Sequence, residues 1–91
     1  MISIELTQRF TRIVRENGRE SEVLKTLRLV AAGFGRPHAH AGLSIRKLSK
    51  NLCECRTNLH WRLIFEARPG CLTFDFAGDH TKVRNYLRGK R

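Results

Sequence analysis

The sequence predicts an α+β fold, in which a two-helix hairpin packs on one face of a four- to five-stranded, mainly antiparallel sheet and a short C-terminal helix follows. Two observations support this order. Apolar residues recur at helical spacing up to residue 34, and from residue 43 to residue 77 they alternate with polar residues. The chain has 91 residues, which suffice for one modest core, so we expect a single domain over 1–91.

The helical hairpin comes first in the chain. One helix is expected over 7–16, because Thr7 suits the cap position and Asn17-Gly18 supplies a stop. The second is expected over 20–34, where apolar residues again recur every three or four positions. Two helices joined by so short a turn usually lie antiparallel and share one apolar face.

The sheet is expected in the second half of the chain. Four segments combine alternating polarity with strand length, and turn-forming residues separate them: 43–48, 52–57, 61–67 and 71–77. They are predicted to pair as antiparallel hairpins. A further short strand over 2–6 is expected at the edge of the same sheet.

Two remaining segments complete the order of elements. The segment 36–42 has neither period nor bulk and is expected to be a loop. Val83, Tyr86 and Leu87 return to helical spacing, which predicts a final short helix that begins near His80.

Alternation along the strands assigns the two faces of the sheet. The face toward the helices is expected to carry Leu63, Phe65, Leu72, Phe74 and Phe76, together with the small apolar pair Cys53 and Cys55. The opposite face is expected to stay open and to carry Glu54, Arg56, Arg62, Ile64, Glu66, Thr73 and Asp75.

The charge of the chain points to a polyanionic partner. Eighteen Lys and Arg against eight Asp and Glu give a formal net charge of +10, and this field attracts phosphate or an acidic protein. Arginine dominates over lysine, which favours planar, bidentate contacts to phosphate. The charge alone does not distinguish RNA from DNA, an acidic protein or an anionic membrane surface.

No apolar run reaches the about 20 residues that a membrane span needs, and the first residues lack the order of a signal peptide. We therefore expect a cytoplasmic protein that does not associate with membranes. The three cysteines are an odd number, and reduced thiols fit that compartment.

A metal site is not expected. Cys53, Cys55, His60, Cys71 and His80 include ligand types, but the chain holds no paired Cys-x-x-Cys units and alternation explains the first two thiols as core. We expect no cofactor either.

The open face nevertheless groups residues suited to RNA cleavage. Metal-free cleavage needs a base for the 2′-hydroxyl, cations for the crowded phosphate and an acid for the leaving oxygen. Arg56, Arg62 and Asp75 are expected on this face, with His80 at the end of the last strand. The alternative is that these arginines are surface residues paired with carboxylates on neighbouring strands.

Five segments of the chain resemble the RelE/ParE superfamily of bacterial toxins from toxin-antitoxin systems. They cover the expected first strand and helix start, three later strands and the last helix: 4–12, 45–48, 52–56, 61–65 and 78–86. Their order and spacing are nearest to the RelE branch.

The resemblance implies a metal-independent endoribonuclease that cuts mRNA, commonly at the ribosome, and is silenced by an acidic antitoxin. It implies that Arg62 contacts the scissile phosphate and that Arg56 assists it. It also implies catalytic roles for His80 and Tyr86. The chain departs from members that carry lysines in the third strand, because it has Cys53-Glu54-Cys55 there.

Further basic residues are expected to bind the RNA backbone: Arg46, Lys47, Lys82 and Arg84. Two other functions stay open. The ParE branch shares the fold and inhibits DNA gyrase by binding protein, and a basic RNA-binding module without catalysis would have the same charge.

Overall fold

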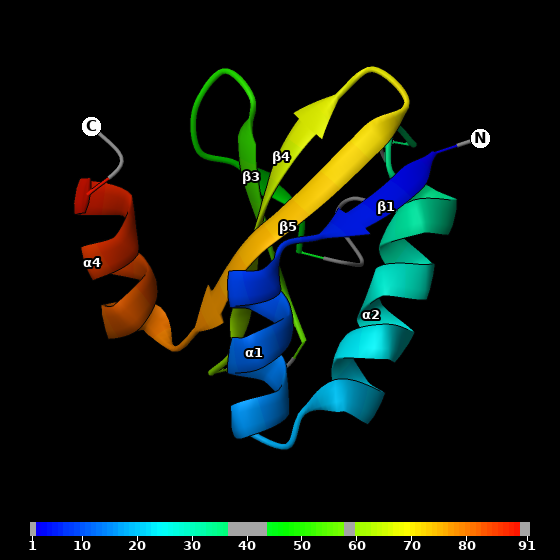
Figure 1. The fold of residues 1–91 in the computed structure, drawn as a ribbon. Coiled ribbons are helices and arrows are strands. Elements are labelled where there is room, and N and C mark those ends of the chain that lie inside the picture. Colours follow the sequence, from blue (N-terminus) through cyan, green and yellow to red (C-terminus); the bar gives the residue numbers. More distant parts are fainter. Residues whose placement is uncertain (1, 37–43, 58–59, 90–91) are drawn as a thin grey trace.

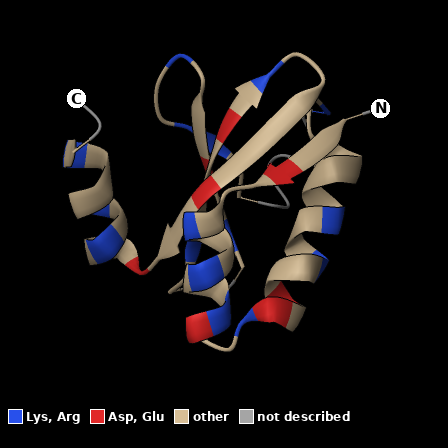
Figure 2. Ribbon diagram, viewed as in Figure 1, with Lys and Arg blue, Asp and Glu red and all other residues tan. Residues whose placement is uncertain are grey.

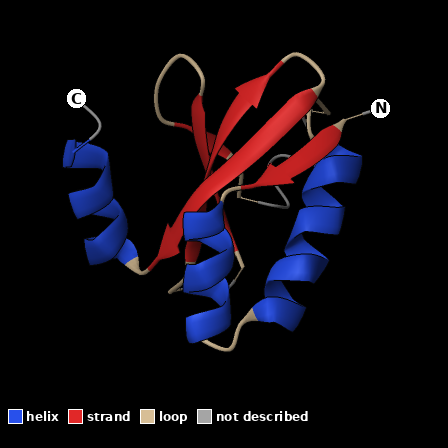
Figure 3. Ribbon diagram, viewed as in Figure 1, coloured by secondary structure: helices blue, strands red, loops and turns tan. Residues whose placement is uncertain are grey.

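The computed structural model describes residues 2–36, 44–57 and 60–89 of the chain (Figure 1). One strand of the sheet comes first in the chain, two helices follow it, and the other four strands come together before the last helix (Figure 3). Their order is β1 (Ser3–Leu6), α1 (Gln8–Glu16), α2 (Glu20–Gly33), β2 (Arg46–Lys47), β3 (Leu52–Arg56), β4 (Arg62–Arg68), β5 (Cys71–Gly78) and α4 (His80–Gly89). The predicted α+β class is confirmed. None of the helices in these ranges has the length and apolar character that crossing a membrane requires.

The strands form one five-stranded sheet in the order β1-β5-β4-β3-β2. The pairs from β2 to β5 are antiparallel, whereas β1 lies parallel to β5, with Ser3 opposite Cys71. The expected edge strand near the N-terminus is therefore confirmed. The strand predicted over 43–48 is much shorter in the structure, where β2 holds only Arg46 and Lys47. The predicted loop lies mostly outside the described residues.

The helix hairpin forms as predicted, with α1 and α2 running in opposite directions beside β1 and β5 (Figure 1). The Thr7 hydroxyl accepts a hydrogen bond from the Phe10 amide at 3.1 Å, which satisfies an N–H group that the first helical turn leaves unpaired. Gly18 takes a positive φ of 64° in the turn between the helices, a conformation that costs glycine little.

The hydrophobic core lies between this hairpin and one face of the sheet. Phe65 is fully buried there, stacked on Phe74 and in edge contact with Phe34. Cys53 and Cys55 are buried in the same cluster, as alternation predicted. Burying a phenylalanine side chain contributes about 1.5–3 kcal/mol, so this face carries much of the stability.

The other face of the sheet differs from the prediction in two ways. Phe65 lies opposite Phe74 and Ile64 lies opposite Phe76, so Asp75 is an extra residue that shifts the register of β5. Phe76 therefore points to the second face, which corrects its predicted place in the core. There its ring stacks on Tyr86 of α4 at 4.3 Å between centroids.

The second face is also not open along its length, because α4 packs against β5 and β4. Val83 of this helix is 3% exposed, and Ile64 of β4 is fully buried although it lies outside the main core cluster. The helix was expected, but its docking on this face was not. Tyr86 of this helix covers Phe76, the residue that the bulge turns to this face.

Candidate active site

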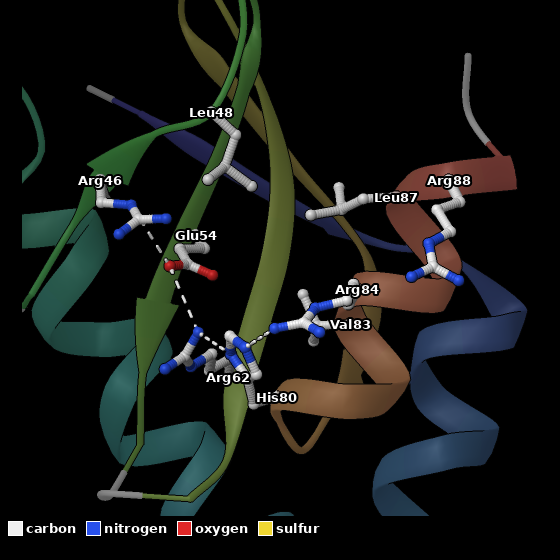
Figure 4. A pocket seen from close by; sticks show the side chains of 9 residues that line it. All are labelled: Arg46, Leu48, Glu54, Arg62, His80, Val83, Arg84, Leu87 and Arg88. Atoms are coloured by element: carbon white, nitrogen blue, oxygen red, sulfur yellow. Dashed lines mark hydrogen bonds and ion pairs between the residues drawn. The ribbon is translucent and has the colours of Figure 1, made fainter.

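A pocket of about 430 Å³ lies between the second face of the sheet and α4 (Figure 4). Arginine is its most frequent lining residue, so we call it the arginine pocket. The strands and the helix each contribute part of its lining: Arg46, Leu48, Glu54 and Arg62 from the sheet side, and His80, Val83, Arg84, Leu87 and Arg88 from α4.

Strand alternation places two of these side chains. Glu54 lies between Cys53 and Cys55, which face the core, so its own side chain points to the second face. Arg62 precedes Leu63, another core residue, and therefore points the same way. The two strands are neighbours, and the side chains meet in the pocket (Figure 4).

The end of β5 positions a third side chain of the pocket, that of His80. Asp79 follows the strand, and its carboxylate accepts a hydrogen bond from the Lys82 amide at 2.9 Å, so α4 begins at once. Gly78 permits the close approach, because a Cβ there would lie 3.1 Å from that of Lys82. His80 is consequently held at the first position of α4, at the mouth of the pocket.

Arg62 is the centre of the interactions. Its Nη1 lies 2.8 Å from His80 Nδ1 and 3.9 Å from Glu54 Oε1. Arg46 Nε lies 3.6 Å from the same carboxylate oxygen. The Glu54 side chain is only 5% exposed and that of Arg62 16% exposed, so solvent screens this pair much less than an ordinary surface ion pair.

His80 lies between two arginines. Arg84 Nη2 is 2.8 Å from its Nε2, while Arg62 occupies the Nδ1 side. Guanidinium groups only donate hydrogen bonds, and a neutral imidazole has one acceptor nitrogen. His80 can therefore accept from one arginine at a time, which leaves the other guanidinium a donor for an anion.

The electrostatics of the pocket suit an anion. Four arginines line it against one carboxylate, that of Glu54. Among the described residues, the Arg62 Nε is a buried nitrogen without a hydrogen-bond partner. Planar guanidinium groups bind phosphate oxygens with paired hydrogen bonds, so phosphate chemistry fits this arrangement.

The structure does not bring every predicted residue into the pocket. Arg84 and Arg46 line it, whereas Arg56, Lys47 and Lys82 do not. Arg56 is exposed at the end of β3, directly opposite Arg62 in the register. Lys47 pairs with Cys53 and so belongs to the core side of the sheet edge, and Lys82 is exposed on α4.

Tyr86 also lies outside the pocket. Its hydroxyl donates a 2.5 Å hydrogen bond to Asp75 Oδ2, and Arg9 of α1 lies 3.7 Å from the same oxygen. Burial, followed by the hydrogen bond to Asp75 and the charge of that carboxylate, raises the pKa of Tyr86 well above its ordinary value. The phenol thus stays protonated and joins α4 to the bulge of β5 and to α1.

Cys53 and Cys55 do not contribute a nucleophile. Burial, with smaller contributions from Glu54 and Cys53, raises the pKa of Cys55 to about 12. The pKa of the Cys53 thiol is also raised, chiefly by burial, so both remain unreactive thiols. Within the described ranges, no three His, Cys, Asp or Glu side chains cluster closely enough to hold a metal ion.

Sequence reasoning placed Glu54 on the same face as Arg62, because it alternates with Cys53 and Cys55, but did not count it among the site residues. It also missed Arg88 and the apolar residues of the pocket wall, since their place depends on how α4 docks.

No protein-family model matches the sequence, and no curated protein matches it either. Solved structures do match. YafQ from E. coli strain BL21(DE3) superposes with a TM-score of 0.67 at 18% identity, covering 91% of this chain and 98% of that one. YafQ in the E. coli DinJ-YafQ toxin-antitoxin complex gives 0.68 at 14% identity, covering 90% and 96%.

A third match is the conserved hypothetical protein HP0894 from Helicobacter pylori, with a TM-score of 0.54 at 17% identity over 89% of this chain and 97% of that one. At these identities the likeness establishes the fold. The chain has the same fold as YafQ over nearly its whole length.

Proposed function

We propose that the chain is a RelE-type toxin that cleaves mRNA at the ribosome in the cytoplasm, and that an acidic antitoxin neutralises it. The observation that carries this proposal is the position of Arg62, whose Nη1 lies beside both His80 and the buried Glu54 in a pocket rich in arginine. The fold shared with YafQ, which has been seen in a toxin-antitoxin complex with DinJ, supports it.

The chemistry is a transfer within the RNA. The 2′-oxygen attacks the adjacent phosphorus, the bond to the 5′-oxygen breaks, and a 2′,3′-cyclic phosphate and a 5′-hydroxyl result. Glu54 and His80 share the two proton transfers, one from the 2′-hydroxyl and one to the leaving oxygen. Arg62 stabilises the charge that builds on the phosphate between them.

The other cations hold the flanking backbone. Arg46, Arg84 and Arg88 line the pocket and bind neighbouring phosphates. Arg56 and Lys82 lie outside the pocket, and Lys47 lies on the core side of the sheet edge; their charges add long-range attraction for the RNA. Tyr86 supports the site by holding α4, and the reaction needs neither a metal ion nor a cofactor.

The antitoxin is proposed from charge. Basic residues lie on α1, α2 and α4 (Figure 2), and the net charge is +10. An acidic protein that binds this surface would stabilise the fold by mass action and exclude RNA from the arginine pocket.

The proposed function is tested by measuring cleavage of mRNA by the purified chain. The assay is run with and without ribosomes, and also in the presence of a chelator. His80→Ala is expected to lower the cleavage rate about 10²–10⁴-fold, and Arg62→Ala about 10²–10³-fold, with RNA association largely retained. Arg12→Ala and His60→Ala are matched controls, since both residues are exposed and neither lines the pocket.

Two outcomes would contradict the proposed function. If the wild type cuts no RNA in either setting, or if the control variants lose as much activity as the site variants, the chain is not this nuclease. Inhibition of gyrase by wild type and both site variants would then favour the protein-binding alternative.

A further inference from the structure

A second pocket adjoins the arginine pocket on the same face of the sheet. Its volume is about 480 Å³. Leu48 and Leu87 line both pockets, and their side chains project toward each other across the gap between β3 and α4 (Figure 4). A ligand that fills one pocket can therefore continue into the other without leaving the surface.

The chemistry of the second pocket is different. Lys50 and Glu66 give it one charge of each sign, and three leucines, Leu48, Leu52 and Leu87, line it. Ser49 and Asn51 add a hydroxyl and an amide. We call it the neutral pocket. Apolar walls with a few polar groups suit a flat, uncharged ring with polar edges rather than a phosphate.

Hydrogen bonds hold the backbone around the neutral pocket in place. The Leu48 and Ser49 amides both donate to the Leu52 carbonyl, at 2.7 and 3.2 Å. The Ala67 amide of β4 donates to the Asn51 carbonyl at 2.7 Å. The turn between β2 and β3 is thus fastened to the sheet, and the position of Asn51 is set before any ligand binds.

The spacing of the two pockets along β3 suits adjacent nucleotides of one RNA strand. Leu52 lies two residues before Glu54 on β3 and points to the same face, which corresponds to about 7 Å along the strand. A phosphate beside Glu54 and Arg62 therefore brings an adjacent nucleotide of an extended RNA to the neutral pocket. Bases of single-stranded RNA are recognised in this way, by apolar contact and by hydrogen bonds to their edges.

We propose that the neutral pocket binds the base of a nucleotide next to the cleaved bond, and that the Asn51 amide reads its edge and sets the sequence preference. This inference rests on the proposed function for the phosphate that enters the arginine pocket. An amide that makes two hydrogen bonds to one base discriminates it from the others by roughly 5- to 150-fold.

Two measurements test the proposal. One maps the cleaved sequences in an mRNA pool on ribosomes. The other compares the binding of four short RNAs that carry a 2′-deoxy residue at the attacking position and differ in the neighbouring base. Asn51→Ala is expected to remove the wild-type preference in both, and Asn51→Asp, which keeps the side-chain size but loses the donor, to change its order.

The control is Asn85→Ala, because Asn85 is exposed on α4 and lines neither pocket. It should keep the wild-type preference. A preference that survives both Asn51 substitutions, or a wild type that binds all four RNAs equally or none of them, overturns the proposal. Base-dependent binding that requires Asn51 but leads to no cleavage would uphold the neutral pocket and refute the nuclease.

Discussion

The two faces of the sheet are built from alternate residues of the same strands, yet they have opposite properties. On one face Leu63, Phe65 and Phe74 are completely buried against the helix hairpin. On the other, Glu54 and Arg62 form an ion pair beneath α4. The comparison shows how a small chain separates stability from chemistry: the apolar face holds the strands rigid, and the rigid strands set the spacing of the charged groups.

The second face is also more dependent on its helix than the first. The lining of the arginine pocket comes partly from the sheet side and otherwise entirely from α4. Val83 is the one buried residue of that helix. Tyr86 adds two further contacts with the sheet, its stack on Phe76 and its hydrogen bond to Asp75. Four substitutions test this difference, in decreasing order of expected effect.

Phe74→Ala and Phe76→Ala compare the faces directly, because the bulge at Asp75 puts these two rings on opposite sides. Phe74→Ala is expected to lower the free energy of unfolding by about 3–5 kcal/mol, since it opens a cavity in the core. Phe76→Ala removes a half-buried ring and its stack on Tyr86, and should cost about 1–2 kcal/mol. Urea unfolding measures both, and equal losses would contradict the assignment of the faces.

Tyr86→Phe keeps the ring on Phe76 but removes the hydrogen bond to Asp75, so it should cost about 1 kcal/mol near neutral pH. The folded state raises the pKa of Tyr86 above its unfolded value near 10. The stabilisation is therefore fully present below about pH 10 and is lost as the pH rises further.

The measurement is the difference in unfolding free energy between wild type and Tyr86→Phe at pH 8 and above pH 10. The difference should shrink at the higher pH. A difference that stays constant would mean that the ionisation of the hydroxyl is not linked to folding.

Arg88→Ala should have the smallest effect, because it removes about one phosphate contact from the rim of the arginine pocket. The slope of log affinity for single-stranded RNA against log salt should fall by about 0.7. Lys25→Ala is the matched control, since Lys25 is exposed on α2. Equal changes in slope for the two variants would place RNA over both sides of the molecule.

Much of this arrangement was predictable from the sequence because it depends on local patterns. The helix hairpin follows from the cap at Thr7, from the turn at Gly18 and from the apolar residues at helical spacing on both sides of that turn. Alternation correctly sent Leu63 and Phe65 inward and Arg62 outward. These assignments need only the period of a helix or strand, which neighbouring residues determine.

The regular alternation in β5 also explains why Phe76 was wrongly predicted in the core. Leu72, Phe74 and Phe76 alternate without interruption, so nothing in the sequence marks the extra residue at Asp75. The bulge becomes favourable only in the folded protein, where Asp75 receives the Tyr86 hydroxyl and faces Arg9. Arg9 lies near the other end of the chain and Tyr86 lies 11 residues further on, so neither belongs to the local strand pattern.

What the sequence by itself determined is the fold class, the excess of positive charge and the face on which Arg62 and Glu54 lie. The tertiary structure alone decided that α4 closes over that face, that His80 meets Arg62 while Tyr86 turns to Asp75, and that two pockets of different chemistry lie side by side. The physical reason is that these features are contacts between separate elements, whose free energy exists only after the core has brought the elements together.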